Sequence, residues 1–111
     1  MSTNAYPALP TLVFVTARHS GAARRMESLV AWVKVTQKRR LRVVDLDADA
    51  APELADRLGV REIPTLLVLD GGHEVDRLEG RATGRQIEEL IRPHLRSREA
   101  FGGRLRGSCE T

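Results

Sequence analysis

Apolar and polar positions along the chain follow strand-like and helix-like patterns in turn. Residues 11–16, TLVFVT, form an unbroken β-branched and aromatic run that is typical of a buried strand. After a turn at Ser20-Gly21 the apolar residues recur with a helical period, at Met26, Leu29, Val30 and Val33. The run LRVVDL, residues 41–46, has the length and composition of a second strand. A strand, a helix and a further strand in this order predict a parallel beginning of the sheet.

The middle of the chain predicts a short helix and then a hairpin. An acidic, alanine-rich stretch follows residue 46, with Pro52 near a helix start and Gly59 near its end. Residues 65–70, TLLVLD, form a third strand, and the Asp-Gly-Gly turn after it leads into residues 73–80, HEVDRLEG, whose alternation suits a partly exposed partner strand. This half of the sheet is therefore expected to be antiparallel.

A capped helix closes the predicted domain. Thr83 with Gln86 three residues later forms a capping-box signature, and the apolar stripe that follows is Ile87, Leu90, Ile91 and Leu95. Pro93 is expected to kink or fray this helix. We predict a leader over residues 1–8, one domain over residues 9–96, and a disordered tail over residues 97–111, in which Phe101 and Leu105 are candidate docking points.

Composition places the chain among soluble globular proteins. Hydrophobic residues make up 41% and charged residues 30%, and no apolar run approaches the roughly 20 residues of a membrane span. The start of the sequence lacks the charged and apolar regions of a secretory signal, so we expect a cytoplasmic protein without a membrane partner. The single cysteine, Cys109, excludes an intramolecular disulfide and a cysteine-based metal cluster.

A modest positive charge does not indicate a nucleic-acid partner. The formal net charge is +3 and the pI is about 9.7. The densest basic cluster, KRRLR at residues 38–42, is interpreted as a solvated loop that leads into a strand, because no aromatic residues accompany it. Nucleic acid is therefore an unlikely class of ligand for this chain.

The order β-α-β-α-β-β-α resembles that of the thioredoxin-like family over about residues 9–96. The most specific part is GVREIPTLLVLDGG, residues 59–72, followed by a hairpin, Gly80 and a capped helix. The resemblance implies an α/β domain with a central mixed β-sheet flanked by helices, and a cis bond between Ile63 and Pro64. The alternative for the proline is a trans bond at the start of a strand. The KaiB-like clock proteins share only the early β-α-β pattern, and the second half favours the ordinary thioredoxin arrangement.

The family's redox motif has no counterpart in this chain. Its Cys-x-x-Cys falls at His19, Ser20, Gly21 and Ala22, or one residue further along, and neither register supplies a sulfur. Dithiol exchange needs one thiolate to attack and a second thiol to resolve the mixed disulfide. The resemblance also implies an acidic residue just before Phe14, where this chain has Val13. It further implies a helix-kinking proline at the position that Glu27 occupies here.

Several residues near the lost motif have both a chemical and a structural interpretation. His19 could act as a base, but a solvent-facing turn histidine is the better interpretation because no orienting acid or nucleophile accompanies it. Ser20 is expected to be the N-cap of the first helix rather than a nucleophile. Arg18, Arg24 and Arg25 flank that helix start and raise the hypothesis of an anion site, against the alternative of solvated arginines.

No metal or cofactor is assigned. The triplet Asp45, Asp47 and Asp49 lacks the glycine and the final glutamate of a calcium loop. Trp32 is expected to be a partly buried packing residue.

The sequence thus favours a redox-inactive thioredoxin-like protein that binds another polypeptide, as an assembly chaperone, adaptor or subunit. In the family, the loops around the motif and the proline form a groove for an extended segment of a client. Basic residues around it would prefer an acidic client. The groove positions here are Arg18, His19, Ser20, Gly21, Arg61, Glu62, Ile63 and Pro64.

Two further hypotheses stay open. One is residual thiol-disulfide oxidoreductase activity in redox homeostasis through Cys109, which a flexible tail could bring to the motif face. The other is a small anion or ligand bound at the start of the first helix.

Overall fold

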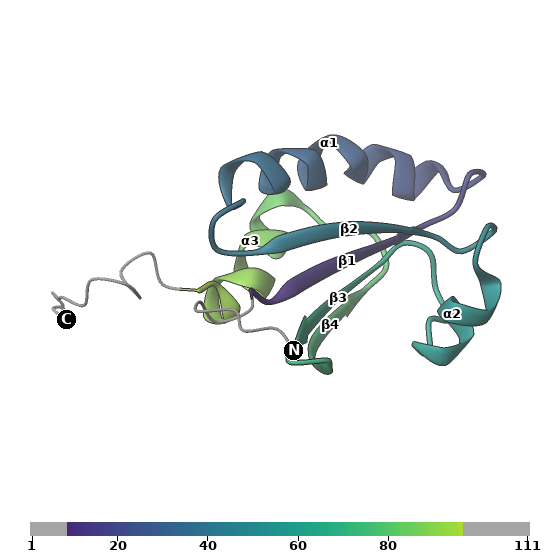
Figure 1. The fold of residues 1–111 in the computed structure, drawn as a ribbon. Coiled ribbons are helices and arrows are strands. Elements are labelled where there is room, and N and C mark those ends of the chain that lie inside the picture. Colours follow the sequence, from purple (N-terminus) through teal and green to yellow (C-terminus); the bar gives the residue numbers. More distant parts are fainter. Residues whose placement is uncertain (1–8, 97–111) are drawn as a thin grey trace, which may run out of the picture.

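One central strand, β1, organises the sheet. The computed structural model describes residues 9–96, drawn in colour in Figure 1. Their elements, in chain order, are β1 (Thr11–Thr16), α1 (Gly21–Thr36), β2 (Arg42–Asp47), α2 (Pro52–Arg57), β3 (Thr65–Asp70), β4 (His73–Glu79), α3 (Gly84–Ile91) and the 3-10 turn η1 (Arg92–His94). The sheet order is β2-β1-β3-β4, with β1 parallel to β2 and antiparallel to β3. The predicted α/β class with a mixed sheet is confirmed, although β2 begins one residue later than expected.

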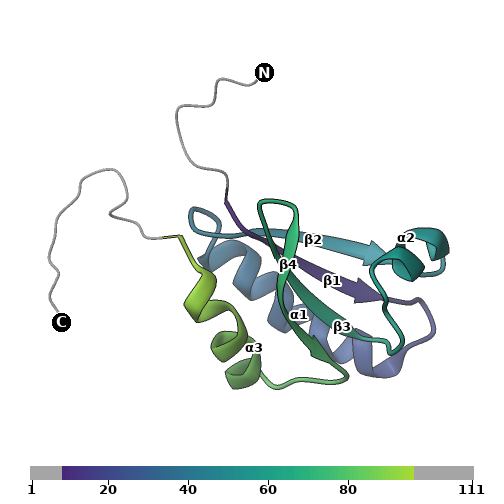
Figure 2. The ribbon, with the colours of Figure 1, turned by 90° about the horizontal axis from the view of Figure 1, so that it is seen from below.

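Both faces of the sheet are covered, and each face has its own core. Leu12 and Phe14 point to one face, where they pack with the buried sides of α1 and α3. Val13 and Val15 point to the other face and pack with Leu67 and residues near α2. Figure 1 shows α1 and α2 on opposite sides of the sheet, and Figure 2 shows the same arrangement from below. Alternation of side chains along a strand explains why neighbours in β1 serve different cores.

Helix α1 begins at the predicted cap and continues without interruption for 16 residues. The Ser20 side chain accepts a hydrogen bond from the Ala23 N–H at 3.0 Å, which confirms its role as N-cap. The expectation for Trp32 was wrong, because this side chain is 58% exposed. Its neighbour Val33 occupies the inward position at this turn of the helix and leaves Trp32 on the rim.

The β3–β4 hairpin is antiparallel, as the pattern predicted. Gly71 and Gly72 form its turn with positive φ angles of 63° and 84°, a backbone conformation that other residues rarely adopt. The register shifts between Val68 and Leu69, and Val75, in the partner strand opposite, is left 44% exposed.

Helix α3 carries the predicted capping box, and its end is fixed by the hairpin. Thr83 and Gln86 exchange both hydrogen bonds of the box. The α-helix stops at Ile91, and Pro93 lies in the 3-10 turn that follows, so the proline ends the helix as expected. His94 in that turn lies 3.0 Å from Asp76 of β4, and this hydrogen bond lowers the pKa of the Asp76 carboxyl.

Within residues 9–96, none of the helices has both the length and the apolar character needed to cross a membrane.

We predict that Thr83→Ala lowers the free energy of unfolding by about 1 kcal/mol, because the N–H of Gln86 loses its capping acceptor. Urea unfolding followed by circular dichroism measures the change. Thr83→Ser keeps the hydroxyl and serves as the control. Equal stability of the alanine variant and the wild type would contradict the assigned cap.

Candidate functional site

The two loops of the expected groove lie at the same end of the strands, where β1 ends and β3 begins. Val15 of β1 is paired with Thr65 of β3 in antiparallel register. The chain that leaves β1 therefore departs beside the chain that enters β3. We call residues 18–22 and 61–64 together the two-loop surface. Sheet register thus brings together two segments that are about 40 residues apart in the sequence.

The first loop is held from β2. The N–H of Arg18 donates to Asp49 Oδ2 at 3.3 Å, and the Asp49 N–H donates in turn to Asp47 Oδ1 at 2.9 Å. The side chains of Arg18 and His19 are exposed, and Ser20 is half-buried at the helix cap. The predicted turn position of His19 is confirmed, and the acidic residues beside it hold the loop backbone.

The second loop is anchored at both ends while its middle is exposed. The Ile63–Pro64 peptide bond is cis, and the carbonyl of buried Pro64 accepts from the Gly80 N–H at 2.8 Å. Thr65 Oγ1 donates to the Glu62 carbonyl at 2.6 Å. A Cβ on Gly80 would stand 3.0 Å from Glu62 Oε2, and its φ of 89° also suits glycine alone.

The backbone N–H groups in the middle of this loop have no backbone partner, although the Glu62 carbonyl accepts from Thr65 Oγ1. Among the residues that the structure describes, the N–H groups of Arg61, Glu62 and Ile63 make no backbone hydrogen bond. Arg61 and Glu62 are also exposed. Residues 62–64 form a bend, and unpaired main-chain donors in it are available to pair with an added strand.

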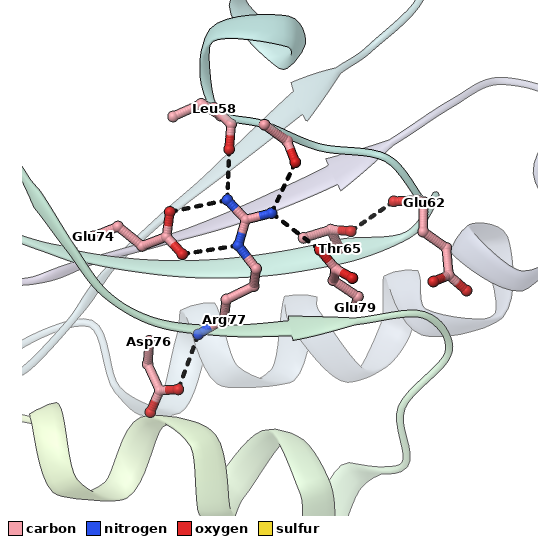
Figure 3. Close-up of polar contacts among 8 residues, drawn as sticks. Leu58, Glu62, Thr65, Glu74, Asp76, Arg77 and Glu79 are labelled. Atoms are coloured by element: carbon pink, nitrogen blue, oxygen red, sulfur yellow. Dashed lines mark hydrogen bonds and ion pairs between the residues drawn. The ribbon is translucent and has the colours of Figure 1, made fainter.

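Arg77 fixes the chain immediately before the second loop (Figure 3). Its guanidinium extends from β4 and donates to the carbonyls of Leu58 and Gly59, just after α2. It also pairs with Glu74 at 2.8 Å and with Glu79 at 3.1 Å. Carbonyls at the end of a helix have no partner inside the helix, so a cation placed there is favourable.

The surrounding carboxylates keep this cation charged. The Glu74 hydrogen bond is the largest contribution that raises the pKa of Arg77, and Glu79 adds to it. The same hydrogen bond lowers the pKa of the Glu74 carboxyl. Arg77 therefore ties α2 to the hairpin at any ordinary pH. Sequence analysis did not single out this residue, because its two carbonyl partners lie 18 and 19 residues earlier in the chain. The available signal was an arginine flanked by Glu74 and Glu79 in an alternating strand.

The hollow beside the first loop suits an anion poorly. It has a volume of about 290 Å³, and its lining residues come from the first loop and from the end of β2 and the turn after it, not from residues 61–64. Arg18 and His19 share its wall with Asp47 and Asp49, whose carboxylates repel an anionic ligand. Within residues 9–96, no group of three or more acidic, histidine or cysteine side chains is placed to hold a metal ion.

The positions of the lost redox motif carry no thiol. His19, Ser20, Gly21 and Ala22 form the turn and the first residues of α1, where the resemblance implies the cysteines. Val13 is buried in β1, and Glu27 is an exposed residue of an unbroken helix. Cys109, Phe101 and Leu105 lie outside the described residues, as does the leader of residues 1–8.

A mixed sheet of this order, with a proline loop beside the start of the first long helix, defines a thioredoxin-type fold. A family model described as thioredoxin matches residues 5–93. The chain belongs to the thioredoxin family.

Two curated relatives and one solved structure illustrate this similarity. Thioredoxin 1 of Nostoc sp. is 29% identical over 87 residues, which cover 78% of this chain and 81% of the relative. A chloroplastic thioredoxin of Arabidopsis thaliana is 29% identical over 87 residues, covering 78% of this chain and 51% of the relative. The structure of a mutant thioredoxin from Halobacterium salinarum superposes with a TM-score of 0.71 at 25% identity, covering 77% and 74% of the two chains. The cytoplasmic location stays a prediction.

We predict that Arg77→Met loosens the segment between α2 and β3. Loss of the hydrogen bonds to two carbonyls lowers the free energy of local opening by about 1–2 kcal/mol, which corresponds to a roughly tenfold faster cleavage by trypsin. Arg57 and Arg61 are exposed arginines that flank this segment and provide the cleavage sites.

The control is Arg81→Met, which removes an exposed arginine just after β4. Cleavage after Arg57 and Arg61 should keep its wild-type rate in this variant. An unchanged rate in Arg77→Met would show that Arg77 does not hold the segment.

Proposed function

We propose that this member of the thioredoxin family binds an extended segment of another protein at the two-loop surface and performs no dithiol exchange there. One observation carries the proposal. Residues 18–22 and 61–64 adjoin the paired ends of β1 and β3, and the motif positions, residues 19–22 of the first loop, hold no thiol. Binding needs the surface and its backbone groups, whereas exchange needs sulfur atoms.

Main-chain pairing is the proposed basis of affinity. The N–H groups of residues 61–63 donate to the main-chain carbonyls of a client strand, as in other cases of β-strand addition. Such a strand crosses toward the exposed turn of Arg18 and His19. Asp49 and Arg77 hold the two loops from outside, so little ordering is required when the client binds.

Charge indicates the kind of client. Arg18 and Arg61 are exposed on the two loops, and Arg24 and Arg25 are exposed in the first turns of α1. The Asp49 carboxylate accepts from the Arg18 N–H and so has a partner within the domain, whereas Glu62 is an exposed acidic residue among these arginines. The four arginines therefore favour an acidic segment and accelerate its association at low salt.

A charge reversal tests the client surface. We predict that Arg61→Glu weakens capture of a client at least about tenfold, because an acidic segment would meet a like charge on the loop that should pair with it. Affinity capture from the source cells with mass spectrometry identifies the client, and titration with the purified client measures the loss.

Arg39→Glu is the matched control, since it makes the same charge change in the exposed turn between α1 and β2, at the opposite end of α1. An equal loss of client affinity in both variants would mean that the effect comes from the overall charge of the protein and not from the two-loop surface. A client kept by both variants but lost on truncation after Ser97 would place binding outside the two-loop surface and overturn the proposal.

The names of the relatives favour a second candidate function, thiol-disulfide chemistry through Cys109. The Cys109 thiolate would attack a disulfide sulfur and form a mixed disulfide while one thiolate leaves, and an external small thiol would then resolve it. We predict that a disulfide reduction assay with glutathione gives the same rate for the wild type and Cys109→Ser. Turnover that disappears in Cys109→Ser would instead establish the oxidoreductase and refute the redox-inactive proposal.

A further inference from the structure

A second, mainly apolar hollow lies between α1 and α3. It has a volume of about 250 Å³, and its apolar walls are Leu29, Trp32 and Val33 of α1 and Ile87 and Ile91 of α3. It belongs to the second half of α1, whereas the two-loop surface lies at the start of that helix. The relatives and the proposed function assign nothing to it.

Two side chains that line this hollow are incompletely packed or paired, namely the Trp32 ring and the Gln37 amide. The Trp32 side chain is 58% exposed at its rim, although the ring is among the largest apolar groups in the chain. Gln37 also lines the hollow, and its buried Oε1 has no hydrogen-bond partner among residues 9–96. An occupant that brings apolar surface would cover the exposed Trp32 ring.

The described chain ends next to this hollow. The Arg96 N–H donates to the Arg40 carbonyl at 3.1 Å, and Arg40 Nε donates back to the Arg96 carbonyl at 3.0 Å. The Arg40 N–H donates to the Gln37 carbonyl at 2.8 Å. Arg96, the last described residue, is therefore linked to Gln37 through Arg40. Figure 2 shows the end of the described chain, just after α3.

The segment that follows has suitable chemistry. Phe101 follows Arg96 by five residues, which an extended chain spans with roughly 17 Å of reach. It is the aromatic residue of the segment 97–111, and the arginines at positions 98, 104 and 106 surround it in the sequence. Glu88 of α3 lines the hollow and offers these arginines an opposite charge.

We propose that residues 97–105 fold back onto the domain and place the Phe101 ring in the hollow against Trp32. An arginine of the segment pairs with Glu88. The tail thus covers the α1–α3 face and stays on the domain, away from the two-loop surface. This inference is independent of the client proposal, because neither loop takes part in it.

Trp32 is the single tryptophan of the chain and reports directly on the hollow. We predict that Phe101→Ala shifts the tryptophan emission to longer wavelength and raises the acrylamide quenching constant about twofold, because the covering ring is removed. Tyr6→Ala is the control, since it deletes an aromatic ring from the other end of the chain. In the wild type, nuclear Overhauser effects should connect the Phe101 ring with the Trp32 indole.

Three outcomes overturn the proposal. Identical quenching in the wild type and Phe101→Ala would mean that the ring does not cover Trp32. An equal rise in Tyr6→Ala would remove the specificity of Phe101. Quenching of the wild type that depends on protein concentration would mean that a second copy of the chain covers the hollow. Far-UV circular dichroism confirms that each variant is folded.

Discussion

The pairing of β1 with both of its neighbours is the constraint on which the rest of the structure depends. Residues Leu12, Val13, Phe14 and Val15 are all buried, and they alternate between the two cores. A shift of the register by one residue would exchange the two sets of side chains and disrupt both cores. The parallel pairing of β1 with β2 and its antiparallel pairing with β3 also determine which loops lie together at each end of the strands.

The two-loop surface is a consequence of that register, and its shape depends on contacts from outside it. Asp49 holds the turn of Arg18, and Arg77 holds the carbonyls of Leu58 and Gly59 before the second loop. Helix α2 has six residues and buries only Ala55, so its own packing contributes little. The guanidinium therefore adds to the apolar contacts by which Leu58, Val60 and Ile63 attach this segment to the sheet.

Dithiol chemistry and the two-loop surface have different physical requirements. Thiol exchange depends on two sulfur atoms, and the positions that the family resemblance implies hold His19, Ser20, Gly21 and Ala22. The cap formed by Ser20 keeps the start of α1 in place without them. Family membership thus fixes the scaffold, while the residues at the helix start determine which chemistry it can perform.

The sequence by itself determined the elements whose signals are local. The apolar run of residues 11–16, the helical period from Met26 to Val33, the glycine turn at Gly71 and the capping box at Thr83 each depend on neighbours within a few residues. Only the tertiary structure decided the role of Arg77 and the exposure of Trp32. The partners of Arg77 lie 18 and 19 residues away, and Trp32 is exposed because of how α1 packs beside α3. Periodicity reports which face of an element is apolar, but the contacts between elements depend on register and packing that no local pattern contains.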